Sequence, residues 1–242
     1  MNDKLLVIPD VHGRPFWRDA VTLHDYSQII FLGDYLDPYA GRENISAEEG
    51  YANFQDIMEW ACGQTHAPVL LLGNHDLHYW RTPYGSTTAG GRYNYQFASN
   101  FRHFFEQYAD RFCMAHEVEI AGKRFLFTHA GVNGDWLQRH SDVITELTAE
   151  KLNTIFPEHL EILNEASWTR GGIHETGSMI WSDVRDMEKS PVDDDKLYQI
   201  FGHSQQPDGP VITPHWACLD CRQAFIIDDK GEIRPVTPPP HK

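Results

Sequence analysis

Short apolar runs recur along the chain, and each is followed within a few residues by a side chain that can bind a metal ion. The runs cover residues 5–8, 29–32, 69–72, 125–127 and 198–201. A continuous apolar run of this length predicts a buried β-strand. Because α/β sheets usually carry their sites at the carboxyl ends of the strands, we expect the residues after these runs to form one site.

Helical patterns separate the first three predicted strands. One helix is expected over residues 15–23, since proline suits the first turn of a helix. A second helix is expected after Ser46, which forms a capping-box pattern with Glu49, and its apolar residues recur at helical spacing. Alternating strands and helices predict parallel strands with right-handed crossovers. A third helix is expected over about residues 96–112, with an aromatic stripe that faces the core.

The second half of the chain is less regular. A hairpin is predicted over residues 118–127, and later strands at 197–201 and 216–227. Strand signals are sparse over residues 133–195, which we interpret as a cap or specificity insertion. Residues 235–242 include three consecutive prolines and are expected to form a flexible tail. Because no repeat or clear linker is visible, we expect a single domain over residues 1–242.

Composition narrows the function classes. A hydrophobic share of 41% allows a sizeable core. The net charge of −15 argues against duplex nucleic acid as a partner, because that binding depends on Lys and Arg neutralising phosphates. No apolar run is long enough to cross a membrane and no secretory signal is visible, so a cytoplasmic location with reduced cysteines is expected. The pair Cys218 and Cys221 lies in an alternating apolar run and is interpreted as structural. The oligomeric state stays open.

The residues after the apolar runs are mainly aspartate, asparagine and histidine. A single pattern is weak evidence, because Asp-x-His is expected about once by chance in a chain of this composition. It occurs twice, at Asp10/His12 and at Asp76/His78. If His129 or His203 were considered without the other motifs, a structural role would be the more typical interpretation. Five strand ends that each carry a ligand-type residue favour a metal site instead, and their number is typical of a two-metal centre.

The motifs at these strand ends also carry a family resemblance. They are Asp10-Val11-His12-Gly13, Gly33-Asp34 with Asp37, Gly73-Asn74-His75-Asp76, His129-Ala130-Gly131 and Gly202-His203. As a set they resemble the calcineurin-like metallophosphoesterases. The similarity is to the branch of the serine/threonine phosphoprotein phosphatases and the bacterial symmetrical diadenosine tetraphosphatases.

The resemblance implies an α/β metallophosphoesterase fold, in which helices flank two packed mixed β-sheets as an α-β-β-α sandwich. It also implies two divalent or transition metal ions, with manganese expected first and iron or zinc as alternatives. Asp34 would bridge the two ions. The remaining implied ligands are Asp10 and His12 on the first ion and Asn74, His129 and His203 on the second.

The resemblance further implies a mechanism. A hydroxide bridging the two ions would attack phosphorus in line with the leaving group. His75 would protonate the leaving group, and Asp37 would orient His75. Asp76 and His78 are expected to be structural or to support the ligands.

One part of the family pattern is missing, because Pro38 stands where the resembled enzymes carry a phosphate-binding arginine. Arginine forks match phosphate oxygens well, so another arginine is expected to bind the substrate phosphate. We rank Arg42 first because of its proximity in sequence. The alternatives are Arg14, Arg81, Arg92, Arg170 and Arg185.

Three functions follow from these expectations. The first is hydrolysis of phosphomonoesters, including phosphoprotein side chains, and the alternative is hydrolysis of a dinucleotide polyphosphate such as diadenosine tetraphosphate. A catalytically inactive scaffold is less favoured, because every ligand residue of the family is retained. A nucleotide would need an aromatic slot for its base, and the candidates for it are Tyr79, Trp80, Tyr84, Tyr93 and Trp136.

Overall fold

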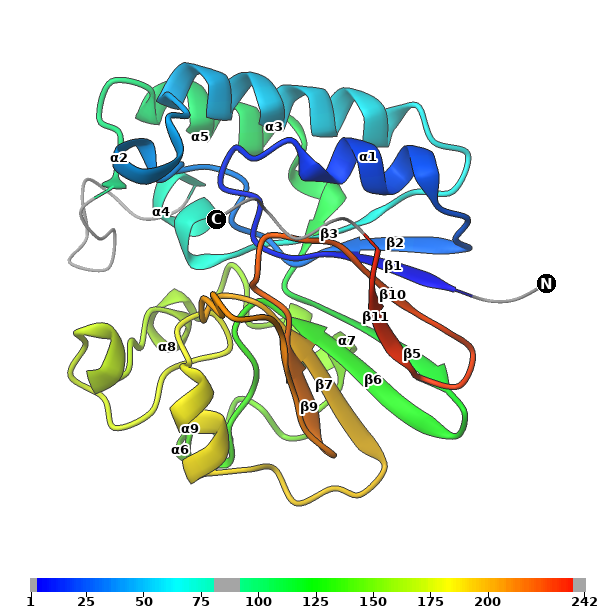
Figure 1. Ribbon diagram of the computed structural model, residues 1–242. Helices are drawn as coiled ribbons and strands as arrows, with labels where there is room; N and C mark the ends of the chain where they lie inside the picture. Colours follow the sequence, from blue (N-terminus) through cyan, green and yellow to red (C-terminus); the bar gives the residue numbers. More distant parts are fainter. Residues whose placement is uncertain (1–3, 81–91, 237–242) are drawn as a thin grey trace. The chain divides into compact units, whose positions relative to one another are not determined.

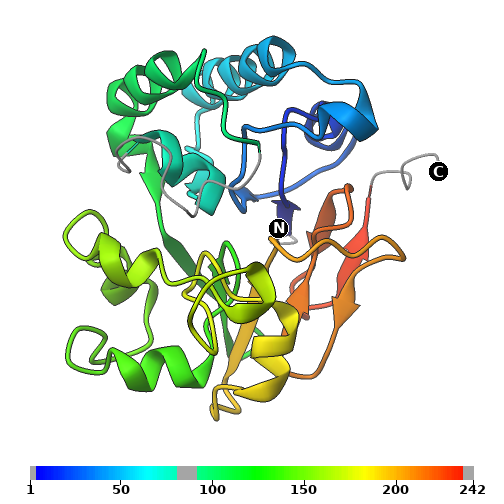
Figure 2. The same cartoon turned by 90° about the vertical axis from the view of Figure 1, so that its left-hand side faces the viewer.

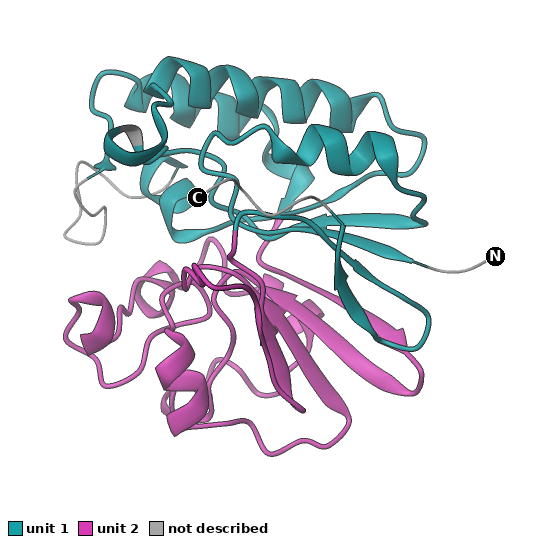
Figure 3. Ribbon diagram, in the orientation of Figure 1, with its two compact units in different colours: residues 1–112, 222–242 teal, residues 113–221 magenta. Residues whose placement is uncertain are grey.

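The computed structural model describes residues 4–80 and 92–236 and divides into two compact units (Figure 3). Unit 1 consists of Met1–Phe112 with Arg222–Lys242, and unit 2 is Cys113–Cys221. Each unit contains one mixed β-sheet, so the expectation of two mixed sheets is confirmed. The expectation of a single domain stays a prediction. Within the described ranges, no helix is both long and apolar enough to cross a membrane.

The sheet of unit 1 has the strand order β11-β10-β1-β2-β3-β4. Strands β1, β2 and β3 pair in parallel, with Ile8 opposite Phe31 and Phe31 opposite Leu70. This register brings the carboxyl ends of the first three predicted strands to one edge of the sheet. The bounds are β1 Leu5–Ile8, β2 Gln28–Phe31, β3 Val69–Leu71, β4 Phe112–Cys113, β10 Phe225–Ile227 and β11 Ile233–Pro235.

Helices α1, α3 and α5 lie on one face of this sheet (Figure 1 and Figure 2). The capping box at the start of α3 is confirmed, since the Glu49 amide donates to Ser46 Oγ at 3.1 Å and the Ser46 amide donates to Glu49 Oε2 at 2.7 Å. The bounds are α1 Phe16–Leu23, α2 Ala40–Glu43, α3 Ala47–Cys62, α4 Asn74–Trp80, α5 Ala98–Gln107 and a 3-10 turn, η2, Ala109–Arg111.

Helix α5 is shorter than expected. Its predicted aromatic stripe is confirmed as core, because Phe101, Phe104 and Phe105 are buried. Phe112, however, lies in β4 and contacts Phe105 with a ring-centroid separation of 5.3 Å. The stripe continues through the turn into the strand, so periodicity alone overextended the helix.

The sheet of unit 2 has the order β5-β6-β7-β9-β8 and again mixes parallel and antiparallel pairs. The predicted hairpin is confirmed as β5 and β6. Its turn residues Ala121 and Gly122 have φ of 51° and 79°, as a tight hairpin turn requires. The bounds are β5 Ala115–Ile120, β6 Lys123–Thr128, β7 Leu197–Phe201, β8 Val211–Ile212 and β9 Trp216–Cys218.

The single strand predicted over residues 216–227 is wrong. Strand β9 pairs with β7 in unit 2, whereas β10 pairs with β1 in unit 1. The connection contains Arg222 at a φ of 64° and buries Leu219, Cys221 and Ala224. Because buried apolar residues alternate with polar ones at Leu219, Asp220, Cys221 and Arg222, the pattern of the connection does not differ from that of a strand.

Residues 133–195 carry short helices and no β-strand, and all of them are described. Side chains of Asn133, Thr148 and Asp183 cap three of these helices by accepting backbone N–H groups. Met187 packs against Phe201 of β7 in the core of unit 2. The role of the segment as a cap or specificity insertion stays a prediction. Its elements are α6 Gly134–Arg139, α7 Ala149–Asn153, α8 Leu160–Leu163, η3 Trp168–Arg170 and α9 Val184–Lys189. Of the predicted tail, residues 237–242 lie outside the described residues.

Candidate metal and catalytic site

The predicted site residues lie in the loops that follow the strands. In unit 1 they follow β1 and β2 and begin α4 after β3, and in unit 2 His129 and His203 follow β6 and β7. The two loops of unit 1 are joined by backbone bonds from His12 N to Asp34 O at 2.7 Å and from Gly13 N to Tyr35 O at 3.0 Å. All eight predicted ligand and catalytic side chains are buried: Asp10, His12, Asp34, Asp37, Asn74, His75, His129 and His203.

The backbone is strained at four of these eight positions. Non-glycine residues with positive φ are uncommon and concentrate at functional sites. Among the described residues seven non-glycine positions have positive φ, and four of these are predicted site residues. They are His12, Asp34, Asp37 and His203, with φ between 45° and 62°. The local conformation is therefore set by the requirements of the side chains.

Three potential ligands converge within unit 1. His12 Nε2 lies 3.9 Å from Asp10 Oδ2 and 3.4 Å from Asp34 Oδ2. His12 Nδ1 lies 2.8 Å from the carbonyl oxygen of Leu36, so Nδ1 carries the proton and donates, and Nε2 keeps its lone pair. Burial, opposed by the Asp34 carboxylate, lowers the pKa of His12 well below its usual value. A neutral imidazole facing two carboxylates is a donor set that fits a divalent cation.

Asp76 supports this group of ligands. Its carboxylate accepts backbone N–H groups from Asp34 at 2.7 Å, Gly73 at 2.8 Å and Tyr35 at 3.0 Å. Burial, followed by the nearby Asp34 carboxylate, raises the pKa of Asp76 well above its usual value, and the three N–H bonds oppose that rise. The expectation that Asp76 is structural thus has a specific geometric basis: it sets the backbone of Asp34.

Asn74 opens α4 directly after Gly73, and His75 donates its backbone N–H to Asp34 Oδ1 at 3.0 Å. A Cβ at position 73 would lie 2.1 Å from Asp34 Oδ1. Glycine is therefore required at this position, because the Asp34 carboxylate packs directly against the backbone.

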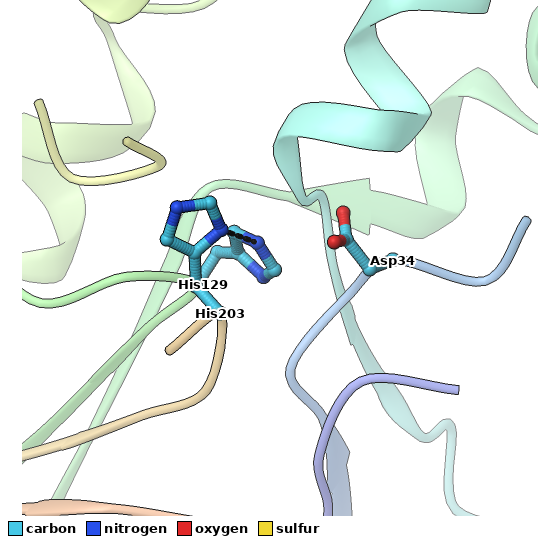
Figure 4. Close-up of side chains that lie close together, drawn as sticks. All are labelled: Asp34, His129 and His203. Atoms are coloured by element: carbon cyan, nitrogen blue, oxygen red, sulfur yellow. Dashed lines mark hydrogen bonds between the residues drawn. The ribbon is translucent and has the colours of Figure 1, made fainter. Parts of the chain in front are cut away.

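His129 and His203 of unit 2 face one another, with His129 Nε2 lying 3.2 Å from His203 Nδ1 (Figure 4). Two nitrogens bound to one ion at about 2.1 Å lie about 3.0–3.4 Å apart for angles between 90° and the tetrahedral value. The observed separation falls in that range. In the metal-free chain one of the two nitrogens carries a proton and donates to the other.

The predicted catalytic pair is formed within unit 1. His75 Nδ1 lies 2.7 Å from Asp37 Oδ2, and the hydroxyl of Tyr79 donates to Asp37 Oδ1. Burial, followed by the Asp37 carboxylate, raises the pKa of Tyr79 above its usual value, so the phenol stays protonated as a donor. Tyr79 was expected only as a stacking candidate. Its spacing from Asp37, 42 residues along the chain, gave no signal of this contact.

Arg92 contacts the other side of His75. Its Nη2 lies 2.9 Å from His75 Nε2, and its Nη1 donates to the carbonyl oxygen of Asp37 at 2.6 Å. Arginine has no acceptor, so Nε2 accepts this bond and Nδ1–H donates to Asp37. Sequence proximity ranked Arg42 ahead of Arg92. Both residues line one cavity of about 430 Å³ together with Asp37.

The other predicted arginines have carboxylate partners or lie outside the described residues. Arg14 forms a two-pronged pair with Glu43 at 2.8 and 3.0 Å. Arg170 and Arg185 both pair with Asp183, at 3.0 and 2.8 Å. Arg81 lies outside the described residues.

The aromatic residues predicted to stack on a nucleotide base differ in their burial. Tyr79, Trp80 and Trp136 are buried and pack within the protein, so their proposed role as a base platform is wrong. Tyr93 is half-buried and stacks on Tyr79 with ring centroids 4.7 Å apart. Tyr84 lies outside the described residues.

His78 is buried beside the catalytic pair. Burial, followed by the effect of the neighbouring His75, lowers the pKa of His78 to about 3. The ring of His78 meets that of His75 edge-on at 5.0 Å. His78 is thus a neutral residue packed beside the catalytic pair, in accord with the expected supporting role.

Comparison with known proteins agrees with this geometry. The family of calcineurin-like phosphoesterases matches residues 4–220. No curated protein sequence matches the chain. Among solved structures, a protein serine/threonine phosphatase from Saccharomyces cerevisiae with similarity to human phosphatase PP5 has a TM-score of 0.54 at 12% identity, covering 99% of this chain and 81% of that one. A metallophosphoesterase from Sphaerobacter thermophilus has a TM-score of 0.48 at 12% identity, covering 98% and 88%.

At 12% identity, the likeness to the yeast phosphatase shows the fold alone. The family match, in contrast, covers most of the chain and includes every strand-end motif described above. The chain belongs to the calcineurin-like phosphoesterases and is a metal-dependent phosphoesterase.

Proposed function

We propose that the protein hydrolyses phosphate esters with two bound metal ions, held by Asp10, His12 and Asp34 on one side and Asn74, His129 and His203 on the other, with Asp34 shared. Two such ions would neutralise the charge that develops on the phosphoryl oxygens and supply a nucleophile at neutral pH. The donor sets support this assignment. Neutral imidazole and carboxylate ligands suit manganese, iron or zinc, with manganese first.

The observation that carries the proposal is the Asp37–His75 pair. Its 2.7 Å bond fixes the His75 ring, in the same unit as the converging group of Asp10, His12 and Asp34. For this role Nε2 would exchange its bond from Arg92 for a proton, which a histidine held by a carboxylate can deliver to a departing alkoxide. Asp37 is held in turn by the hydroxyl of Tyr79. His75 is therefore the proposed acid, Asp37 its orienting partner, and Tyr79 the residue that positions Asp37.

Phosphomonoesters, including phosphoprotein side chains, are the first proposed substrates, and a dinucleotide polyphosphate is the alternative. A general acid matters most when the leaving group is a strong base. The test therefore compares a phosphoserine peptide, which has a poor leaving group, with p-nitrophenyl phosphate, which has a good one. We expect His75→Asn to lose about 100-fold or more in kcat on the peptide and clearly less on p-nitrophenyl phosphate.

The matched control is His103→Asn, which changes an exposed histidine on α5 in the same way. It is expected to keep wild-type rates on both substrates. Equal losses on the two substrates in His75→Asn would rule out the acid role, and a fully metal-loaded wild-type protein that hydrolyses neither substrate nor diadenosine tetraphosphate would refute the proposed function.

A further inference from the structure

A cavity of about 430 Å³ opens beside the catalytic pair in unit 1. Asp37, which holds His75, forms part of its wall, and so does Arg92, which contacts His75 Nε2. Tyr39, Arg42 and Asn94 also line it. Cavities of about 300–1,000 Å³ are typical of sites for small molecules.

The charge of this cavity is unusual for the protein. The chain has a net charge of −15, and carboxylates are paired with most of its arginines, including Arg14, Arg124 and Arg139. Among the described residues, no carboxylate side chain pairs with Arg42 or Arg92. Asp37 contributes to the wall, but its two carboxylate oxygens are engaged by His75 and Tyr79. Two guanidinium groups that share one cavity without a carboxylate partner form a site for an anion.

Arg92 occupies a defined position in this cavity. Its guanidinium stacks on the ring of Tyr39, 3.6 Å from the centroid, and donates to the carbonyl oxygen of Asp37 at 2.6 Å. Its remaining contact is with His75 Nε2, the atom that the proposed function assigns to the leaving group. Arg42, in contrast, is exposed on α2 at the wall of the same cavity. An anion bound by both arginines would therefore lie next to the departing oxygen.

We propose that this cavity is a subsite for a leaving group that is itself a phosphate, so that the protein cleaves small phosphoanhydrides in addition to phosphomonoesters. The inference rests on the proposed function of His75. Water supplies a hydroxyl to the attacked phosphorus and a proton to the departing side. The bond between that phosphorus and the bridging oxygen breaks, and its electron pair stays on the leaving phosphate, whose charge Arg42 and Arg92 bind. Arg92 exchanges its bond to His75 for one to this phosphate.

The first test compares two substrates of metal-loaded protein: diadenosine tetraphosphate, whose leaving group carries phosphate, and p-nitrophenyl phosphate, whose leaving group does not. We expect Arg42→Gln to lower the ratio of their kcat/KM values about tenfold, because one hydrogen bond between charged groups is lost. Arg92→Gln is expected to lower it at least as much, and Arg92→Lys to restore part of it. Arg111→Gln is the charge-matched control, because Arg111 is exposed and outside the cavity.

A ratio that is the same in Arg42→Gln, Arg92→Gln and wild type would overturn the inference and leave the proposed function standing. A second readout does not depend on catalysis: binding of inorganic phosphate to metal-stripped protein, measured by calorimetry. The double change of Arg42 and Arg92 to Gln is expected to weaken this binding about tenfold or more. If wild type hydrolyses neither of these substrates nor the phosphoserine peptide, the proposed function fails. The phosphate-binding measurement then decides the subsite alone: loss of binding in the double variant supports it, and unchanged binding overturns it.

Discussion

The Tyr79→Phe substitution isolates the support of the catalytic pair from its packing. Phenylalanine keeps the ring that stacks on Tyr93 and meets Phe101 edge-on, each with centroids 4.7 Å apart. The substitution removes only the hydroxyl. That hydroxyl donates to Asp37 and accepts the Asn94 backbone N–H at 2.8 Å.

The expected loss of stability follows from these two bonds. A bond to a charged carboxylate contributes about 1.5–3 kcal/mol and a neutral bond about 0.5–1.5 kcal/mol, so Tyr79→Phe should lower the free energy of unfolding by about 2–4.5 kcal/mol. With a denaturant slope of about 3 kcal/mol per molar urea, the midpoint should fall by about 1 M. Because no cavity is created, this loss measures the hydrogen bonds and not the packing.

The assay is urea unfolding of metal-free protein, followed by tryptophan fluorescence. Tyr95→Phe is the control, since Tyr95 is 73% exposed and its substitution should leave the midpoint unchanged. The turnover of Tyr79→Phe on the phosphoserine peptide is expected to fall as well, because Asp37 loses one of the two groups that hold it. An unchanged midpoint and an unchanged turnover would refute the idea that Tyr79 positions Asp37.

Three further outcomes are expected. Asp34→Asn should lower the metal content measured by mass spectrometry, and wild-type content would contradict the assignment of Asp34 as a shared ligand. Gly73→Ala should cost at least about 3 kcal/mol in urea unfolding, because its Cβ would meet Asp34 Oδ1 at 2.1 Å, whereas Gly41→Ala, with nothing within 4 Å, should change little. Burial raises the pKa of the Cys113 thiol to about 11, so the rate of its labelling by iodoacetamide should be slow at pH 8 and should increase up to about pH 11. Cys62, which is exposed, should be labelled readily at pH 8 and serves as the control. Fast labelling of both cysteines at pH 8 would contradict this expectation.

Local and regular features were predictable from the sequence. Apolar runs found β1, β2, β3, β6 and β7, because a buried strand needs a continuous apolar segment. The capping box of Ser46 and Glu49 found the start of α3, because its donors and acceptors lie three residues apart. The fold of the family followed from motifs attached to these strand ends.

Contacts between distant residues were not predictable in the same way. Arg92 meets the Asp37 carbonyl group across 55 residues, and no local spacing encodes that distance. Arg42 was ranked first because it lies close to Asp37 in the sequence, whereas Arg92 remained one of several alternatives because it lies far from Asp37. Likewise, the break between β9 and β10 is invisible in the pattern, because Leu219 and Ala224 are as buried as the strand residues that flank them.

The three backbone bonds of Asp76 have a consequence for the order of folding. The Asp76 carboxylate accepts the backbone N–H of Asp34, which lies 42 residues earlier in the sequence. Asp34 itself has a positive φ. Closing so long a loop is a late and slow step compared with forming a helix turn. We therefore expect the ligand group around Asp34 to form only after the segments that carry Asp34 and Asp76 have come together. Metal ions would select the finished native state rather than nucleate it, so chelation should accelerate unfolding and leave the rate of refolding unchanged.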